Sequence, residues 1–369
     1  MRLIRYTLLV LLIGLFSGLQ AQDIHWSLYQ MSPLTLNPAL TGAYEGTARI
    51  GGIYRDQARS ITSNAFSTPS IYGDAPLLNV GKTDWVGVGG LLFSDQAGEG
   101  QLQNTAALAS IAYHKSLDKK RNTVLSFGLQ GGIVQRRIDL NGTSTENPDG
   151  GFTNTGLWFG DEVEQSLRNN QPRMQTSMSR QNGFVDNVSY FDLNAGVLLT
   201  TKLNKQTDIN IGASLYHILK PKYGFFKGNE NPSGIQDPDS LTVRLPMRFQ
   251  LHGQFNFAMN KKWTLSPGFL YNRISSASEL QVQALLGYTI NPQKETTLRF
   301  GPGYRLGDAF EVLLGVDMKN LRVMASYDVT LSSLSDLNSS VGGFEIAAYY
   351  IIKIFKEPVV KPVIFCPRF

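Results

Sequence analysis

Residues 243–257 read VRLPMRFQLHGQFNF, and apolar side chains alternate with polar ones along this stretch. The apolar set is Val243, Leu245, Met247, Phe249, Leu251, Phe255 and Phe257, interrupted only by Gly253, and the polar set is Arg244, Pro246, Arg248, Gln250, His252, Gln254 and Asn256. Successive side chains of a strand point to opposite faces, so the pattern predicts one long two-faced strand. Soluble strands usually have about 5–6 residues, whereas about 9–11 residues cross a bilayer at a tilt. The stretch therefore predicts a strand that spans a membrane.

The first 21 residues have the features of a cleaved export signal. Arg2 and Arg5 precede an apolar run that ends at Leu19-Gln20-Ala21, which predicts cleavage after Ala21. A membrane anchor is the alternative, although the run is short for a span. No later stretch approaches about 18 consecutive apolar residues, so no transmembrane helix is predicted. The chain is then secreted, periplasmic, or a barrel in an outer membrane, and the repeated two-faced strands favour the barrel.

Composition points the same way. The chain has 36 Gly and 15 Tyr but only 17% charged residues, a mixture typical of a β-barrel with aromatic girdles. The formal charge of +5 falls by two without Arg2 and Arg5, which leaves no electrostatic footprint for nucleic acid. Cys366 is the single cysteine, so an internal disulfide and a thiolate zinc site are both excluded.

The periodicity predicts an all-β fold, a transmembrane antiparallel β-barrel of about 14 strands. The predicted strands are 47–55, 60–68, 85–93, 102–114, 122–136, 190–200, 208–217, 243–257, 263–272, 279–290, 296–305, 309–318, 321–329 and 343–352. Pro246, Pro267 and Pro302 fall inside these strands, where each requires a bulge or a position near a rim.

The links between the strands alternate in length. Short polar links, often with lysine, are expected at 116–122, 203–207, 260–262, 291–295 and 319–320, and longer or variable ones at 137–189, 218–240, 273–278, 306–308 and 330–342. Outer-membrane barrels have short periplasmic turns, longer outside loops and an even strand number, so both chain ends are expected in the periplasm. The predicted parts are a signal peptide at 1–21, a periplasmic segment at 22–46, the barrel at 47–352 with a long extracellular loop at 137–189, and a periplasmic tail at 353–369.

Strand parity also predicts which polar side chains face the lumen: Arg49, Arg55, Asp192, Arg244, Arg248, Arg299, Arg305, Glu311, Asp317, Arg322, Asp328 and Glu345. Both signs of charge occur, so these groups can pair across the interior. We expect a lumen filled by side chains or by an inserted segment. The segment 137–189 is a flexible surface loop, a partner-binding loop or a lumen plug.

No catalytic or metal-binding motif stands out. The four histidines lack metal-ligand spacing, and neither a GxSxG elbow nor a P-loop is present. His114 and His217 are the residues that a barrel hydrolase would use, but the sequence places no partner beside them. We therefore predict a non-enzymatic protein without a cofactor.

The chain resembles the PorP/SprF family of outer-membrane proteins at both ends. The resemblance rests on Trp26, Ser27, Tyr29, Pro33, Asn37-Pro38-Ala39, Thr41-Gly42, Arg49 and Tyr54-Arg55, and on SYDVTLSSLS at 326–335, GGFEIAAYY at 342–350 and the terminal CPRF. It implies a barrel of the type IX secretion system or gliding motility machinery. Its partners would be secretion components, periplasmic ring or peptidoglycan-linked proteins, or the C-terminal domain of a large secreted adhesin.

Two segments are candidates for partner binding. Residues 22–46 either tuck into the periplasmic mouth of the barrel or dock a partner, and the tail 353–369 reads as an extended arm able to add a strand to a periplasmic partner. The candidate residues are Trp26, Tyr29, Asn37, Pro38, Thr41, Gly42, Cys366, Pro367, Arg368 and Phe369. The alternative function is an outer-membrane transporter or channel for a small solute.

Overall fold

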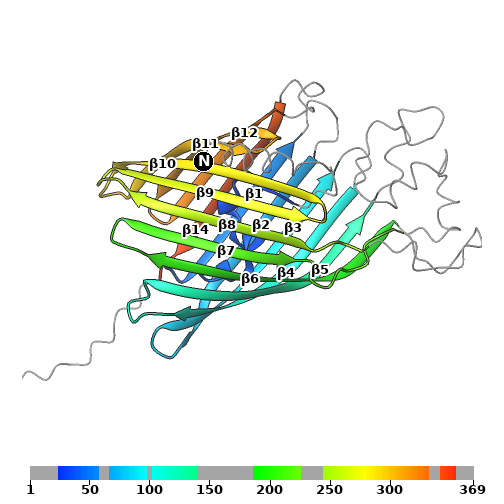
Figure 1. The fold of residues 1–369 in the computed structure, drawn as a ribbon, viewed down its shortest axis with the longest axis horizontal. Helices are drawn as coiled ribbons and strands as arrows, with labels where there is room; N and C mark the ends of the chain where they lie inside the picture. Colours follow the sequence, from blue (N-terminus) through cyan, green and yellow to red (C-terminus); the bar gives the residue numbers. More distant parts are fainter. Residues whose placement is uncertain are drawn as a thin grey trace, which may run out of the picture.

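A computed structural model describes residues 24–57, 66–97, 102–138, 186–225, 244–331 and 341–354. Within them, fourteen antiparallel strands close into one barrel (Figure 1). The strands are β1 (Ala48–Gln57), β2 (Phe66–Val80), β3 (Asp84–Ala97), β4 (Leu102–Ser116), β5 (Thr123–Arg137), β6 (Asn187–Lys202), β7 (Thr207–Tyr216), β8 (Arg248–Ala258), β9 (Trp263–Ile274), β10 (Ala277–Asn291), β11 (Thr296–Arg305), β12 (Ala309–Met318), β13 (Leu321–Thr330) and β14 (Val341–Ile352). The predicted fold class and strand number are confirmed.

The first and last strands close the barrel. β1 pairs with β14 over its whole length, from Ala48 opposite Ile352 to Gln57 opposite Gly343, and on its other side with β2. Each strand therefore has two neighbours. Hydrocarbon offers no partner to a free N–H or C=O group, so a membrane sheet requires this closure.

The outer face of the wall is apolar, and the inner face carries the buried polar side chains together with some apolar ones, such as Ile53 and Leu313. Along β12, Glu311 is fully buried, whereas its neighbours Phe310 and Val312 are 40% and 43% exposed. Ile50 on β1 and Ile133 on β5 are each 62% exposed. An apolar outer face of this kind is stable in lipid rather than in water. Helices in the described part of the chain are short turns, and none of them could span a membrane.

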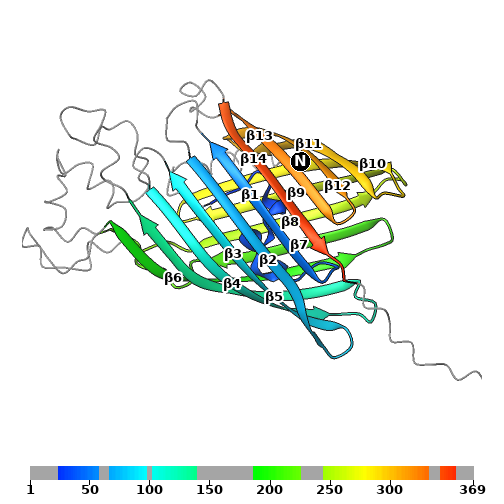
Figure 2. The ribbon, with the colours of Figure 1, turned by 180° about the vertical axis from the view of Figure 1, so that it is seen from behind.

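The barrel has two different mouths. The short-turn mouth carries the turns 81–83, 117–122, 203–206, 259–262, 292–295 and 319–320, together with the start of β1 and the end of β14. The long-link mouth carries the links 58–65, 98–101, 138–186, 217–247, 275–276, 306–308 and 331–340. Figure 2 shows the strands from behind, running between these two ends.

Two predicted strands are corrected by the structure. The second strand is Phe66–Val80, not 60–68, and most of the predicted range lies outside the described residues. The alternation of this strand holds from Thr68 to Asp74 and is lost near Pro76, where a register shift lies between Pro76 and Leu78. β8 begins at Arg248, not at residue 243, because Pro246 has no N–H to donate.

Pro267 and Pro302 do lie inside strands, but without the expected bulge. In the β8–β9 pair, Pro267 and the neighbouring Ser266 have no register partner on β8. In the β10–β11 pair, Pro302 and the neighbouring Gly301 have none on β10. The register on either side of each gap is the same. A wide barrel thus tolerates a proline by giving up local ladder bonds instead of shifting the strand.

Candidate functional site

The lumen contains the segment that precedes the first strand. We call residues 24–47 the plug. It contains three short helical turns, η1 (Tyr29–Met31), α2 (Pro33–Leu36) and η2 (Pro38–Leu40), which the strands surround (Figures 1 and 2). A proline starts both α2 and η2, where a missing N–H costs nothing, and the Asn37 side chain accepts the Ala39 N–H at the start of η2.

The plug crosses the barrel from one mouth to the other. At the long-link mouth, Arg248, the first residue of β8, donates to the Ile24 carbonyl at 3.1 Å, and Arg55 near the end of β1 donates to the His25 carbonyl at 2.7 Å. At the short-turn mouth, Trp85, the second residue of β3, donates to the Gly42 carbonyl at 2.9 Å. The segment predicted to lie in the periplasm thus lies inside the barrel from residue 24 onward. Residue 24 is at the opposite mouth from the end of β14, so the prediction that both ends lie on the short-turn side is corrected for the N-terminal end of the described chain.

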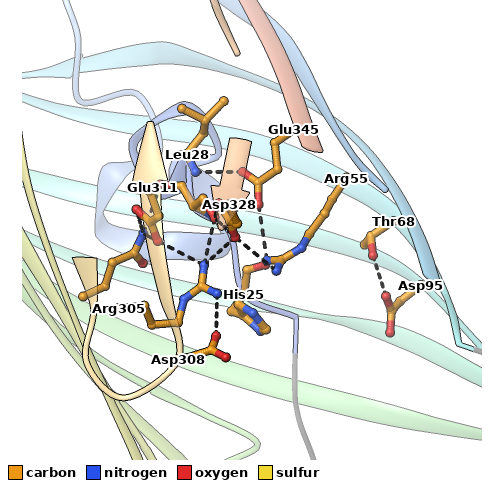
Figure 3. Close-up of polar contacts among 12 residues, drawn as sticks. His25, Leu28, Arg55, Thr68, Asp95, Arg305, Asp308, Glu311, Asp328 and Glu345 are labelled. Atoms are coloured by element: carbon orange, nitrogen blue, oxygen red, sulfur yellow. Dashed lines mark hydrogen bonds and ion pairs between the residues drawn. The ribbon is translucent and has the colours of Figure 1, made fainter. Parts of the chain in front are cut away.

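A charged cluster near the long-link mouth holds the start of the plug (Figure 3). The Ser27 and Leu28 N–H groups donate to the two Glu345 carboxylate oxygens, each at 2.8 Å. The Ser27 hydroxyl donates to Asp328 at 2.8 Å and accepts from Arg305, also at 2.8 Å. These contacts satisfy plug backbone groups that would otherwise be buried without partners.

The charged groups of this cluster also pair with one another across the strands. Arg305 also lies 3.1 Å from Glu311 and 3.2 Å from Asp328, and Arg55 lies 3.3 Å from Glu345. Gln281 and Gln283, both on β10, donate to Glu311, and each of them also donates to the Ser27 carbonyl. We call Ser27, Arg55, Arg305, Glu311, Asp328 and Glu345 the Ser27 cluster. All six side chains are buried, and the cluster fixes the start of the plug.

Asn37 holds the middle of the plug. Its side chain is fully buried, and its amide donates to the Val197 carbonyl at 2.9 Å and the Ala213 carbonyl at 3.3 Å. The wall beside it is built of glycine: a Cβ at Gly196 would strike the Asn37 side chain, and one at Gly128 would strike the Pro38 carbonyl. Plug and wall therefore approach more closely here than any larger residue would permit.

The end of the plug is fixed at the short-turn mouth. Gly42 has φ 71°, a left-handed conformation that suits glycine, and its N–H donates to Asp74 at 2.7 Å. Asp74 also forms an ion pair with Arg49 at 2.7 Å. The Tyr44 hydroxyl donates to the Asp74 carbonyl, and burial together with the Asp74 charge raises the pKa of Tyr44.

The candidate partner-binding residues of the plug all face the barrel wall. Trp26, Tyr29, Asn37, Pro38 and Thr41 are buried, and the Gly42 N–H is bonded to Asp74. Their part in partner binding stays a prediction. Cys366, Pro367, Arg368 and Phe369 lie outside the described residues.

The candidate lumen residues fall into three groups. Buried are Arg55, Asp192, Arg248, Arg305, Glu311, Asp328 and Glu345; half-buried are Arg49, Arg299, Asp317 and Arg322; exposed is Arg244. Arg299 and Arg322 share Asp317 at 2.7 and 2.6 Å, which is the cross-strand pairing expected of mixed charges. Arg244 lies before the start of β8 and donates to the Lys220 carbonyl.

The sequence did not single out several wall residues that bind the plug. Gln130 donates to the Leu34 carbonyl at 3.0 Å, and the Tyr216 hydroxyl donates to the Thr35 carbonyl at 2.8 Å. Gln130 is on the polar face of the predicted strand 122–136, so strand parity could have identified it as a residue that faces the lumen. Strand parity could not identify Asp74, because the predicted second strand, 60–68, ended before it.

The two histidines considered for catalysis have structural partners. His114 is fully buried, and its ring nitrogens meet the Ser126 hydroxyl at 2.7 Å and the Thr41 carbonyl at 2.8 Å. His217 pairs with Asp192 at 3.0 Å. In the ranges that the structure describes, no group of three His, Cys, Asp or Glu side chains is placed to hold a metal ion.

Comparisons with known proteins identify one family and several solved structures of similar fold. The family model described as type IX secretion system membrane protein PorP/SprF matches residues 18–350. Solved structures similar to this chain include the CymD monoaromatic hydrocarbon channel (9% identity, TM-score 0.47, covering 93% of this chain and 97% of that one) and the Ralstonia pickettii toluene transporter TbuX (13%, 0.45, 91% and 96%). A Pseudomonas aeruginosa FadL homologue is similar too (11%, 0.45, 91% and 100%). Among curated proteins, nothing matches the chain.

Proposed function

Because the chain belongs to the PorP/SprF family of type IX secretion system membrane proteins, we propose that it is a closed barrel that binds a large secreted protein and helps to export it or to anchor it at the cell surface. The family and the barrel fold point to the outer membrane. An adhesin is the kind of cargo we propose, held through its C-terminal domain.

The observation that supports this proposal is the plug. A conduit for a polypeptide needs an open path, but here the plug crosses the lumen and is bonded to the wall at both mouths. Side chains from β2, β5, β7, β8 and β10 bond its backbone, so its release would break many buried hydrogen bonds at once. We therefore propose that cargo binds to the outside of a closed barrel and does not pass through it.

The long-link mouth is the surface that we propose for the cargo. Outside loops of outer-membrane barrels are usually the longer ones, so this mouth would face the cell surface. We place the secretion components and any periplasmic ring or peptidoglycan-linked protein at the opposite mouth, where the tail 353–369 begins. The loop at 137–189 is the main candidate for cargo contact.

Deletion of the gene tests the proposal. We expect one or a few large exported proteins to disappear from the cell surface, and a plasmid copy of the wild-type gene to restore them. Surface proteomics and co-purification of the tagged barrel in detergent would identify the cargo. An unchanged surface proteome would contradict the proposal, and a loss of small-solute uptake without a change in surface proteins would support the transporter alternative.

A further inference from the structure

The short-turn mouth carries a lysine in every turn. Each of the six turns there contributes at least one: Lys82, Lys119, Lys120, Lys205, Lys261, Lys262, Lys294 and Lys319. All eight are exposed. We call them the lysine ring, because the six turns follow one another around a closed barrel.

The ring has a strong excess of positive charge. Arg121 adds a further exposed cation to the turn 117–122, while the same six turns contain only the carboxylates Asp118 and Glu295. Asp118 is engaged within its own turn, where it accepts the Thr123 N–H at 3.0 Å, and the backbone hydrogen bonds that it accepts lower its pKa. The field of the ring is therefore positive around most of the circumference.

A second feature repeats with the lysines. An exposed apolar side chain stands at or beside each of the same turns: Val80 (42% exposed), Leu117 (57%), Leu203 (62%), Met259 (62%), Ile290 (53%) and Met318 (43%). Aromatic rings lie at the same level, since Trp263 at the start of β9 packs against Tyr288 with ring centroids 4.7 Å apart. Apolar anchors with lysines just beyond them are the arrangement that suits a membrane–water interface.

We propose that the lysine ring binds the phosphate headgroups of acidic phospholipids in the leaflet at the short-turn mouth. A protein that docks on the mouth would contact one side or the lumen opening, whereas the paired apolar and cationic positions recur at every turn. Lipid is the partner that surrounds a barrel on all sides. Lysines close to an anionic surface are attracted to it, so a ring of eight selects acidic headgroups.

The test compares four-residue variants of the whole protein in nanodiscs made from phosphatidylethanolamine and phosphatidylglycerol. One variant carries K82Q, K205Q, K261Q and K294Q, from four different turns. The matched control carries R137Q, K220Q, R244Q and R273Q, which removes four exposed cations at the long-link mouth. Mass spectrometry of the retained lipid then gives the share of phosphatidylglycerol around each barrel.

We expect the wild type and the control to retain phosphatidylglycerol above its share in the bulk mixture, and the ring variant to fall to the bulk share. High salt should reduce the wild-type enrichment, because exposed charges are screened. Equal enrichment in the ring variant, or an equal loss in the control, would overturn the proposal. The first of these results would indicate that the lysines bind a protein partner instead of lipid. A second set, K119Q, K120Q, K262Q and K319Q, repeats the test if the first variant does not fold.

Discussion

The hydroxyl of Ser27 lies 2.8 Å from both carboxylate oxygens of Asp328, a residue 301 positions later in the chain. This bond joins the start of the plug to β13, one of the last strands of the barrel. The plug can therefore reach its final position only in a barrel whose C-terminal strands are in place. The structure of the lumen and the closure of the wall are thus coupled.

Ser27→Ala should destabilise the folded barrel. The change leaves Asp328 and Arg305 without a hydroxyl partner in a buried site, and an unsatisfied buried group costs about 1–3 kcal/mol. Urea unfolding in lipid vesicles, followed by tryptophan fluorescence, would measure the loss. Ser276→Ala, at an exposed turn, is the control and should shift stability by less than about 0.5 kcal/mol. Equal effects would show that Ser27 contributes nothing.

Arg305→Met should be more damaging than Ser27→Ala. It leaves Glu311 and Asp328 without their guanidinium at 3.1 and 3.2 Å, and breaking a buried ion pair from one side costs about 3–5 kcal/mol. Adding Asp328→Asn should recover part of that loss, because it removes one uncompensated charge. A double-mutant cycle on the same unfolding assay measures this coupling, and strict additivity would contradict the role of the cluster.

Gly128→Ala should disturb the middle of the plug. Its new methyl group would strike the Pro38 carbonyl, and overpacking of this kind costs about 1–3 kcal/mol. Gly90→Ala is the matched control, because the nearest atom to its added Cβ lies 3.9 Å away. The Gly128 variant should lose stability and expose the plug to protease, while the Gly90 variant behaves as wild type. Identical proteolysis of both variants would argue against tight contact at Pro38.

Thiol labelling tests the direction of the plug. In a C366S background, which removes the single cysteine, I24C and S276C should react together with an impermeant maleimide on intact cells. K261C, at the short-turn mouth, should react only after the outer membrane is permeabilised. The reason is that Ile24 is held at the long-link mouth by Arg248. Labelling of I24C together with K261C would reverse the direction that we describe.

The strands were the part of the fold that periodicity could predict. The predicted ranges 296–305 and 309–318 coincide with β11 and β12, because exposed apolar residues recur at every second position, from Leu298 to Tyr304 and from Phe310 to Leu314. β2 was misplaced because its apolar residues do not recur at every second position: Leu77 and Leu78 are adjacent, and a register shift lies between Pro76 and Leu78. A rule based on side-chain parity fails where the backbone itself is irregular.

The lumen was predictable only in outline. Mixed charges such as Arg305 and Glu311 indicated an interior that pairs with itself, and the two do meet. The position of the plug was not evident, since its buried residues, among them Asn37 and Thr41, follow neither strand nor helix periodicity. Its contacts are backbone groups met by distant side chains, and a local sequence pattern does not contain them.

Planar-bilayer conductance measures whether the plug closes the barrel. The purified wild-type protein should give no large, stable open currents, whereas a variant that lacks residues 24–41 should open, because nothing else described here crosses the lumen. The deletion must still show the mobility of a folded barrel in a heat-modification gel. Large, stable currents from the wild type would contradict the account.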